Sequence, residues 1–296
     1  MRTRAPGRRA RARAVMAAGA AVVFATAVAR RAEGDGVDLV GAGASPPGAV
    51  LDRAVDEGAV VVPIAAALAA SGRLHDPEAA RVPALLAAEY ARMRASAGTV
   101  PAPFVATYAG FQQPGAFDLL EVGAGAEEPR GALVFLHGYG GSFALPCWEV
   151  AQAARQARLA TYCPSIGPSG AWWTRDGEAT VQKTLAAVRA RGIDRVWLAG
   201  LSNGAIGASR LAPKLRGQIR GLVLVSGAAP DARAPGVPTL VVQGKRDTMS
   251  PPSLAQGYAR RTAARYVELD AGHFALLSQR DAALSAIAGF LHDEVR

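Results

Sequence analysis

Short apolar segments alternate with helix-like segments through the second half of the chain, and this alternation limits the possible folds more than any other feature. The apolar segments are five or six residues long and lie at 132–136, 159–163, 195–199, 221–226, 238–243 and 265–269. The helix-like segments lie between or after them, at 147–158, 178–191, 204–215, 251–263 and 279–294. Strands that alternate with helices in this way form a mostly parallel sheet with helices on both faces. We therefore predict an α/β fold with a doubly wound sheet.

Two weaker strands are expected at 105–108 and 117–122, and we place the start of the α/β domain at residue 100. Residues 50–99 contain several helix-like stretches and are expected to form a helical extension. The sequence leaves open whether this extension packs on the sheet or shields a site. Residues 32–49 are rich in Gly, Ala and Pro, so we expect a flexible linker there.

A serine lies between two glycines where a predicted strand meets a predicted helix. The motif is Gly200-Leu-Ser202-Asn-Gly204. A tight turn of this kind strains the backbone of the serine, leaves room only for glycine on either side and lifts the hydroxyl above the sheet. By chance alone, a chain this rich in glycine and serine has about a one-in-six probability of carrying the motif, so its context matters.

Three further chemical groups follow predicted strands. The sequence His137-Gly-Tyr-Gly-Gly141 follows one strand, Asp247 follows another, and His273 follows the last. The order along the chain is therefore a glycine-rich turn, a serine, an acid and a histidine. In this order and spacing, residues 100–296 resemble the α/β-hydrolase superfamily, in its serine esterase and lipase-like branch.

The resemblance implies a role for each group. Ser202 would be the nucleophile, His273 the general base and then the acid, and Asp247 the group that holds the imidazole in its working tautomer. The backbone N–H groups of Asn203 and Tyr139 would form the oxyanion hole, where one donor contributes about 3 kcal/mol of barrier lowering. Residues 100–296 are accordingly expected to be the catalytic domain.

Substrate contacts are expected from the glycine-rich turn and from the loop that follows the strand at 159–163. The candidates are His137, Gly138, Gly140, Trp172 and Trp173. His137 also suits a structural role in its turn, with its ring bonded to backbone, and the two tryptophans also suit a place over the domain core. The interval between the strands at 221–226 and 238–243 is too short for an inserted lid.

Alternatives to the acid and to the base remain open. Asp231 follows the strand at 221–226, where some hydrolases of this fold carry their acid. His75 and His292 are the other histidines, and we expect the first in a loop and the second on a terminal helix.

The N-terminus accounts for most of the positive charge. The formal net charge is +9, but six arginines lie within the first 13 residues. Without residues 1–29 the chain has 27 basic and 24 acidic side chains, which argues against nucleic-acid binding. Residues 14–29 are apolar and too short for an ordinary membrane span. We interpret residues 1–31 as an export signal or an uncleaved N-terminal anchor, with a twin-arginine signal as a further possibility. The hydrolase would then be periplasmic, extracellular or tethered to the outer side of a membrane.

The chain contains two cysteines, Cys147 and Cys163. One is expected near a helix start and the other at a strand end, on the same rim of the sheet. We predict a disulfide between them, worth about 3 kcal/mol for a loop of this size. The alternative is a pair of partly buried free thiols.

Together these features predict an exported serine hydrolase that cleaves small-molecule or polymeric carboxylic esters through an acyl-enzyme on Ser202. The motif Gly-Leu-Ser-Asn-Gly is also similar to the turns of some polyester depolymerases and feruloyl esterases. A peptidase or amidase of the same fold is the alternative within the enzyme class, and a non-catalytic binding protein is the alternative outside it. No cofactor or metal motif is recognised in the sequence, and it leaves the oligomeric state open.

Overall fold

The computed structural model describes residues 37–41, 52–125 and 128–295. Within them an eight-stranded sheet has the strand order β1-β2-β4-β3-β5-β6-β7-β8. The strands are β1 Val37–Gly41, β2 Asp118–Val122, β3 Gly131–Leu136, β4 Leu159–Pro164, β5 Val196–Leu201, β6 Gly221–Val225, β7 Thr239–Gly244 and β8 Arg265–Leu269. From β4 to β8 in this order every neighbouring pair is parallel. The pairs β1–β2 and β2–β4 are antiparallel. The predicted α/β fold with a doubly wound, mostly parallel sheet is confirmed.

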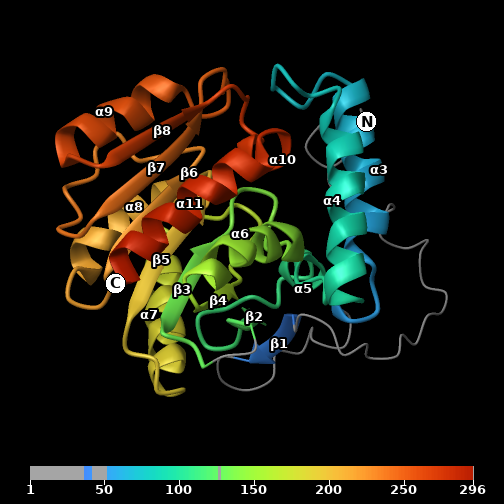
Figure 1. Ribbon diagram of the computed structural model, residues 1–296. Coiled ribbons are helices and arrows are strands. Elements are labelled where there is room, and N and C mark those ends of the chain that lie inside the picture. The colour runs from blue at the N-terminus through green and yellow to red at the C-terminus, as the bar shows by residue number, and fades with distance from the viewer. Residues whose placement is uncertain (1–36, 42–51, 126–127, 296) are drawn as a thin grey trace, which may run out of the picture. The chain divides into compact units, whose positions relative to one another are not determined.

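Helices cover both faces of this sheet (Figure 1). They are α3 Glu57–Ala70, α4 Val82–Ala97, α5 Phe104–Tyr108, α6 Ala144–Gln156, α7 Arg175–Arg189, α8 Asn203–Leu215, α9 Pro252–Thr262, α10 Ala275–Ser278 and α11 Arg280–Val295. Side chains of α6 and α11 form one apolar core with one face of the central strands, and those of α7, α8 and α9 form a second core with the other face. Alternate residues of β3 divide between the two, since Leu133 and Phe135 join the first core and Val134 joins the second.

The extension forms the helices α3 and α4, which lie side by side (Figure 1). Tyr90 and Met93 of α4 are buried in the core that contains α6 and α11. Glu57, at the start of α3, is also buried. The extension therefore packs against the α/β domain as part of one core.

Residues 105–108 do not form the expected strand, because they belong to the short helix α5. Pro103 occupies its N-cap with φ −64°, a helical value that proline adopts without cost. The carboxylate of Asp52 then accepts a hydrogen bond from the N–H of Ala106 at 2.9 Å. This long-range bond satisfies a donor of the first turn, so it favours the helix over a strand.

The expected flexible linker is wrong for residues 37–41, because they form β1 at the edge of the sheet. Val37 lies opposite Val122 and Gly41 opposite Asp118 in the antiparallel register. The apolar stretch 14–29 and the export signal or anchor expected over 1–31 lie outside the described residues.

The predicted disulfide is confirmed, since Cys147 of α6 and Cys163 of β4 are bonded. The bridge ties the first turn of a helix to the carboxyl end of the strand beside it. No helix in the described ranges is long and apolar enough to cross a membrane.

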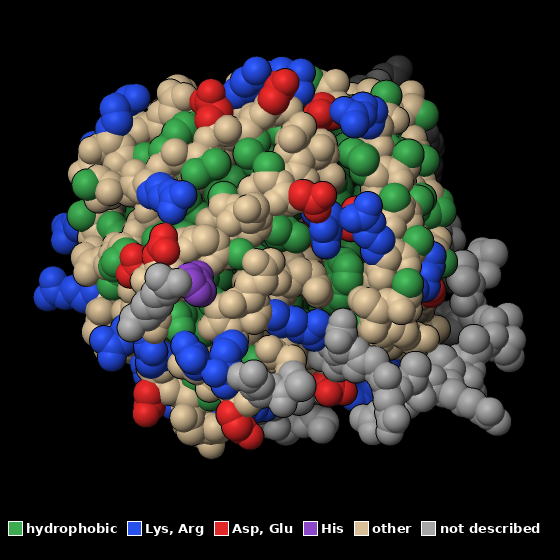
Figure 2. Space-filling model, viewed as in Figure 1, with side chains coloured by type: hydrophobic (Ala, Val, Ile, Leu, Met, Phe, Trp, Pro, Cys, Tyr) green, Lys and Arg blue, Asp and Glu red, His purple; other side chains and the backbone are tan. Residues whose placement is uncertain are grey.

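Acidic and basic side chains are interspersed on the face that Figure 2 shows, with apolar side chains between them. This mixture agrees with the nearly balanced charge of the sequence after residue 29.

Candidate active site

Ser202 occupies the tight turn between β5 and α8. Its backbone has φ 54° and ψ −118°, a conformation that side-chain-bearing residues rarely adopt. Its N–H donates to the carbonyl oxygen of Val225 in β6 at 2.9 Å, which holds the strained residue against the neighbouring strand. Such strain persists only where the surrounding structure enforces it, and it gathers at functional sites.

The two glycines of the turn are required by close backbone contact. A Cβ atom on Gly200 would lie 2.3 Å from the carbonyl carbon of Gly204. A Cβ atom on Gly204 would lie 1.9 Å from the carbonyl oxygen of Leu136 in β3. Any larger residue at either position would push the start of α8 away from the strand ends.

Ser202, His273 and Asp247 form a continuous hydrogen-bonded chain, which we call the triplet. The Nε2 atom of His273 lies 3.0 Å from the Oγ atom of Ser202, and its Nδ1 atom lies 2.8 Å from the Oδ2 atom of Asp247. The carboxylate can only accept, so Nδ1 carries the hydrogen and Nε2 is left to accept from the serine hydroxyl. Both His273 and Asp247 are buried.

Asp247 is fixed by further donors. Its Oδ1 atom accepts from the backbone N–H groups of Met249 at 2.9 Å and Ser250 at 2.7 Å. Its Oδ2 atom also accepts from the side-chain amide of Gln243 at 2.8 Å. The carboxylate therefore has one orientation, with Oδ2 directed at the imidazole.

The triplet is assembled at the carboxyl edge of the parallel strands, since its members follow β5, β7 and β8. Ser226, at the end of β6, supports it by donating from Oγ to the carbonyl oxygen of His273 at 2.8 Å. The sequence analysis did not single out Ser226, and its position directly after a strand was the only available signal.

The glycine-rich turn, residues 137–141, lies beside Ser202. A Cβ atom on Gly138 would be 3.2 Å from the Cβ atom of Ser202. The N–H of Gly140 is used within the fold, because it donates to the carbonyl oxygen of Pro168 at 2.8 Å. Within the described residues, the backbone N–H groups of Tyr139 and Asn203 donate to no other group. These two donors flank the serine and are free for a ligand.

The side chain of His137 supports the turn from inside the protein. Its Nδ1 atom donates to the carbonyl oxygen of Gly138 at 2.8 Å, and its Nε2 atom accepts from the N–H of Ile166 at 3.2 Å. Burial lowers the pKa of His137 to about 4, so the ring is neutral at pH 7. The expected substrate contact of His137 is therefore corrected, because both of its ring nitrogens already form hydrogen bonds with backbone groups.

The two neighbouring tryptophans have different environments. Trp172 has no exposed surface, and its indole N–H donates to the carbonyl oxygen of His137 at 2.8 Å. The expected substrate contact of Trp172 is therefore also corrected, because its side chain belongs to the core beneath the turn. Trp173 is 40% exposed, with the guanidinium of Arg210 5.8 Å from the centre of its ring.

Within the described residues, the alternative acid and the other two histidines form no hydrogen bond with the side chains of the triplet. The exposed carboxylate of Asp231 forms hydrogen bonds with the guanidinium of Arg210, which lower its pKa. His75 contributes its carbonyl oxygen to a hydrogen bond with the hydroxyl of Thr248, and His292 lies near the end of α11. Of the candidate acids, the structure brings only Asp247 to His273.

Two carboxylates of the extension, which the sequence analysis did not assign to the site, contact the loop of His273. Asp76 accepts from the N–H of His273, and Glu78 accepts from the N–H of Gly272 at 2.9 Å. In sequence, Asp76-Pro77-Glu78 suits the cap and first turn of a helix. The local pattern carried no sign that its carboxylates serve backbone groups almost 200 residues away.

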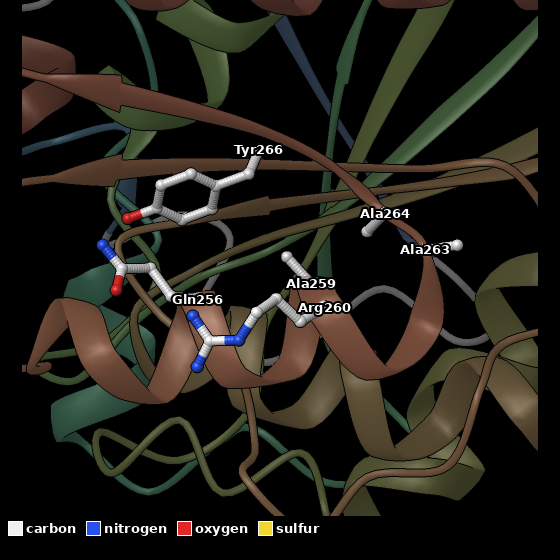
Figure 3. A pocket seen from close by; sticks show the side chains of 6 residues that line it. All are labelled: Gln256, Ala259, Arg260, Ala263, Ala264 and Tyr266. Atoms are coloured by element: carbon white, nitrogen blue, oxygen red, sulfur yellow. The ribbon is translucent and has the colours of Figure 1, made fainter.

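A surface hollow of about 610 Å³ lies elsewhere, between α9 and the edge strand β8. Gln256, Arg260 and Tyr266 project into it from the helix and the strand (Figure 3). It contains no member of the triplet. Among the described residues, no cluster of histidine, cysteine or carboxylate side chains is suited to hold a metal ion.

Comparison with solved structures shows that the fold is that of the α/β hydrolases, as predicted. Est1E from Butyrivibrio proteoclasticus matches with a TM-score of 0.54 and 14% identity, over 61% of this chain and 95% of that chain. The Pyrococcus furiosus esterase Pf2001 matches with a TM-score of 0.52 and 15% identity, over 61% and 88% of the two chains. XC6422 from Xanthomonas campestris, described as an α/β serine hydrolase without a lid, matches with a TM-score of 0.50 and 18% identity, over 60% and 89%. Similarity at these identities establishes the fold and leaves the activity to the chemistry of the site.

Comparisons of the sequence with models of protein families and with curated proteins gave no match.

Proposed function

We propose that this chain is an exported serine hydrolase that cleaves carboxylic esters through an acyl-enzyme on Ser202. The observation that carries the proposal is the hydrogen-bonded chain from Ser202 through His273 to Asp247, at 3.0 Å and 2.8 Å. These distances match the reach needed between a nucleophile, its base and the group that orients the base. The strained turn at Ser202 and the two free backbone N–H groups beside it add independent support.

In the first half of the reaction, Nε2 of His273 takes the proton of the Ser202 hydroxyl as Oγ bonds to the ester carbonyl carbon. The carbonyl oxygen gains the negative charge, and Asp247 stabilises the imidazolium through Nδ1. The bond from that carbon to the alcohol oxygen then breaks, and the proton on Nε2 passes to the departing alkoxide. In the second half, Nε2 of His273 takes a proton from water as the water oxygen bonds to the acyl carbon. The bond from that carbon to Oγ of Ser202 then breaks, Oγ takes the proton from Nε2, and the carboxylic acid is released.

The oxyanion hole in this proposal consists of the backbone N–H groups of Tyr139 and Asn203. Asn203 is the first residue of α8, so its N–H lies at the positive end of the helix dipole. Its side chain donates to the carbonyl oxygen of Ser169 at 2.8 Å, which fixes this first turn. Of the expected substrate contacts, Gly138, Gly140 and Trp173 remain in the proposal. Gly138 would contribute backbone close to the serine, Gly140 the backbone of the same turn, and Trp173 its exposed ring.

The substrate class in the proposal is a small-molecule or polymeric ester. Tyr139, which follows Gly138 in the turn beside Ser202, is 78% exposed. Two exposed aromatic rings, Tyr139 in the turn and Trp173 in the loop after β4, suit an aromatic or extended acyl group. A structure of Est1E contains bound ferulic acid, and its TM-score to this chain is 0.51. This makes a ferulate ester a sensible probe.

Export is proposed from the basic and apolar character of residues 1–31. The disulfide between Cys147 and Cys163 is compatible with it, because disulfides persist in oxidising compartments.

The test is to measure kcat/KM on p-nitrophenyl esters from acetate to palmitate, on methyl ferulate and on aminoacyl anilides, with the Ser202→Ala variant as control. We expect ester hydrolysis that the variant lacks, and covalent labelling of Ser202 by an organophosphonate. Turnover confined to the anilides would instead indicate a peptidase. Equal rates for wild type and variant would contradict the proposal.

A further inference from the structure

Residues 75–78, between α3 and α4, contact both loops that carry the acid and the base of the triplet. We call this stretch the bracing segment. Its contacts with the loop of His273 come from two carboxylates. The Oδ2 atom of Asp76 accepts from the N–H of His273, and the Oε2 atom of Glu78 accepts from the N–H of Gly272 at 2.9 Å. Glu78 also accepts from the hydroxyl of Ser278 at 2.7 Å, at the end of α10.

The fit between the bracing segment and this loop is close. A Cβ atom on Gly272 would lie 2.4 Å from both carboxylate oxygens of Asp76, so only glycine allows the approach. Glu78 is 7% exposed, and the N–H of Glu78 donates to Oδ1 of Asp76 at 2.8 Å. The Asp76 carboxylate is thus held between its own turn and the backbone of His273.

The bracing segment also contacts the loop of Asp247. The hydroxyl of Thr248 donates to the carbonyl oxygen of His75 at 2.8 Å. The guanidinium of Arg246 lies 3.6 Å from Oε1 of Glu78. Thus each residue next to Asp247 on the chain contacts the bracing segment.

The contacts with the loop of His273 hold the backbone N–H groups of Gly272 and His273, whereas those with the loop of Asp247 hold the side chains of Arg246 and Thr248. None of them touches the reacting atoms. Hydrogen bonds to an ionised acceptor are about twice as strong as neutral ones, so two of them on consecutive N–H groups restrict the loop firmly. The rotation of the His273 ring about its side-chain bonds is set by Asp247. The position from which the ring projects is set by the backbone that Asp76 and Glu78 hold.

We infer that Asp76 and Glu78 are positioning residues, which place the imidazole of His273 within reach of both Ser202 and Asp247. The inference rests on the proposed function, because it assigns the extension a role in that same hydrolytic site. The helical extension is then part of the hydrolytic machinery, and the α/β domain alone has an incomplete base loop.

The test compares full-length Asp76→Ala, Asp76→Asn and Thr248→Val with wild type on an ester that wild type hydrolyses. The matched control is Asp270→Ala, which removes a carboxylate from the same loop. Asp270 forms ion pairs with Lys245 and Arg246 and, within the described residues, no hydrogen bond with His273. The readouts are kcat, KM, the rate of phosphonate labelling at Ser202 and the melting temperature.

We expect Asp76→Ala to lower kcat and the labelling rate about 10- to 100-fold, with KM within twofold, because displacement of a reacting group by about 1 Å has effects of this size. Asp76→Asn keeps one oxygen acceptor and should recover part of the loss. Thr248→Val, which is isosteric and leaves both carboxylates in place, should lower kcat a few-fold. Asp270→Ala should stay within twofold of wild type.

Wild-type rates in Asp76→Ala, or a loss in Asp270→Ala as large as in Asp76→Ala, would overturn the inference while leaving the proposed function intact. If Asp76→Ala fails to fold, wild-type kcat in both Asp76→Asn and Thr248→Val would overturn it. Absence of hydrolysis and of Ser202 labelling in wild type itself would instead overturn the proposed function, and this inference with it.

Discussion

The carboxylate of Glu57 caps the first turn of α6, with its Oε2 atom 2.8 Å from the backbone nitrogen of Ala144. The Oε1 atom of Glu57 also accepts from the N–H of Leu145 at 3.1 Å and from the hydroxyl of Tyr90 at 2.9 Å. Glu57 is buried, and it belongs to the extension, 87 residues before its partner in α6. Because Ala144 follows the glycine-rich turn by three residues, this contact fixes the exit of that turn.

Replacement of Glu57 by glutamine should reduce the free energy of unfolding by about 2 kcal/mol, because one side-chain oxygen cannot accept from all three donors that the carboxylate satisfies. The measurement is urea denaturation at pH 8, above the pKa of about 7 to which burial raises Glu57. Tyr90→Phe is the matched control, since it removes only one of the three donors and should cost about 1 kcal/mol. Equal stability of Glu57→Gln and wild type would contradict the assignment of Glu57 as the cap of α6.

Asp247→Asn should lower kcat about 10³- to 10⁴-fold with little change in folding. The amide nitrogen of asparagine would donate to Nδ1 of His273, which places the ring hydrogen on Nε2 and prevents it from accepting the serine proton. Asp231→Asn is the control, since that side chain is exposed and bound to Arg210. The kcat values of the two variants show which aspartate orients His273. A large loss of kcat in Asp231→Asn with a mild loss in Asp247→Asn would reverse the assignment.

The strands after residue 130 and the candidate triplet could be predicted because their signals are local. Each buried strand is a run of apolar residues, and the glycines on either side of Ser202 are dictated by contacts that no other residue allows. The order of Ser202, Asp247 and His273 after successive strands then places them at one edge of the sheet without knowledge of any distance.

The remaining features depend on partners that are distant in sequence. α5 forms where a strand was expected because Asp52 binds the N–H of Ala106. Residues 37–41 form a strand by pairing with β2, but they lie within a segment whose Gly, Ala and Pro content suits a linker. The carboxylates of the bracing segment serve backbone N–H groups, and in the loop that carries these groups the contact is reflected in the sequence by Gly272, a residue that a tight turn would equally explain.

The two tryptophans show the same limit in a single dipeptide. Trp172 is buried because two glycines, one in α7 and one in α8, make room for it. A Cβ atom on Gly207 would lie 2.3 Å from the Cβ atom of Trp172, and one on Gly177 would lie 2.5 Å from its Cα atom. No local pattern distinguishes Trp172 from Trp173.

Trp173→Ala should therefore raise KM for aromatic and long-chain esters about fivefold and leave kcat within twofold, as expected for the loss of about 1 kcal/mol of apolar contact. Trp172→Ala is the comparison and should instead destabilise the fold by about 3–5 kcal/mol, because it opens a cavity in the core. Steady-state kinetics on the ferulate and acetate esters, together with urea denaturation, separate the two effects. Unchanged KM values in Trp173→Ala would remove this residue from the proposed substrate site.

The stability of the fold should decrease as the pH rises from 5 to 8, because a buried carboxyl pair joins the extension to the sheet. Burial and the neighbouring Asp118 raise the pKa of Asp52 from 3.8 to about 8, and burial raises the pKa of Asp118 as well. The folded chain therefore holds a proton that the unfolded chain releases near pH 4. The stability that this proton provides is complete below pH 3.8 and is lost as the pH rises through 8.

For one proton the expected slope is about 1.4 kcal/mol per pH unit. Glu57, whose pKa burial raises to about 7, adds a slope of the same sign, so the informative quantity is the difference between wild type and Asp118→Asn. Asparagine removes the neighbouring charge and lowers the pKa of Asp52, and the profile of unfolding free energy against pH should become shallower between pH 5 and 8. Urea midpoints at four pH values in this range measure both profiles. Parallel profiles for the two proteins would show that the Asp52–Asp118 pair does not share its proton in the folded state.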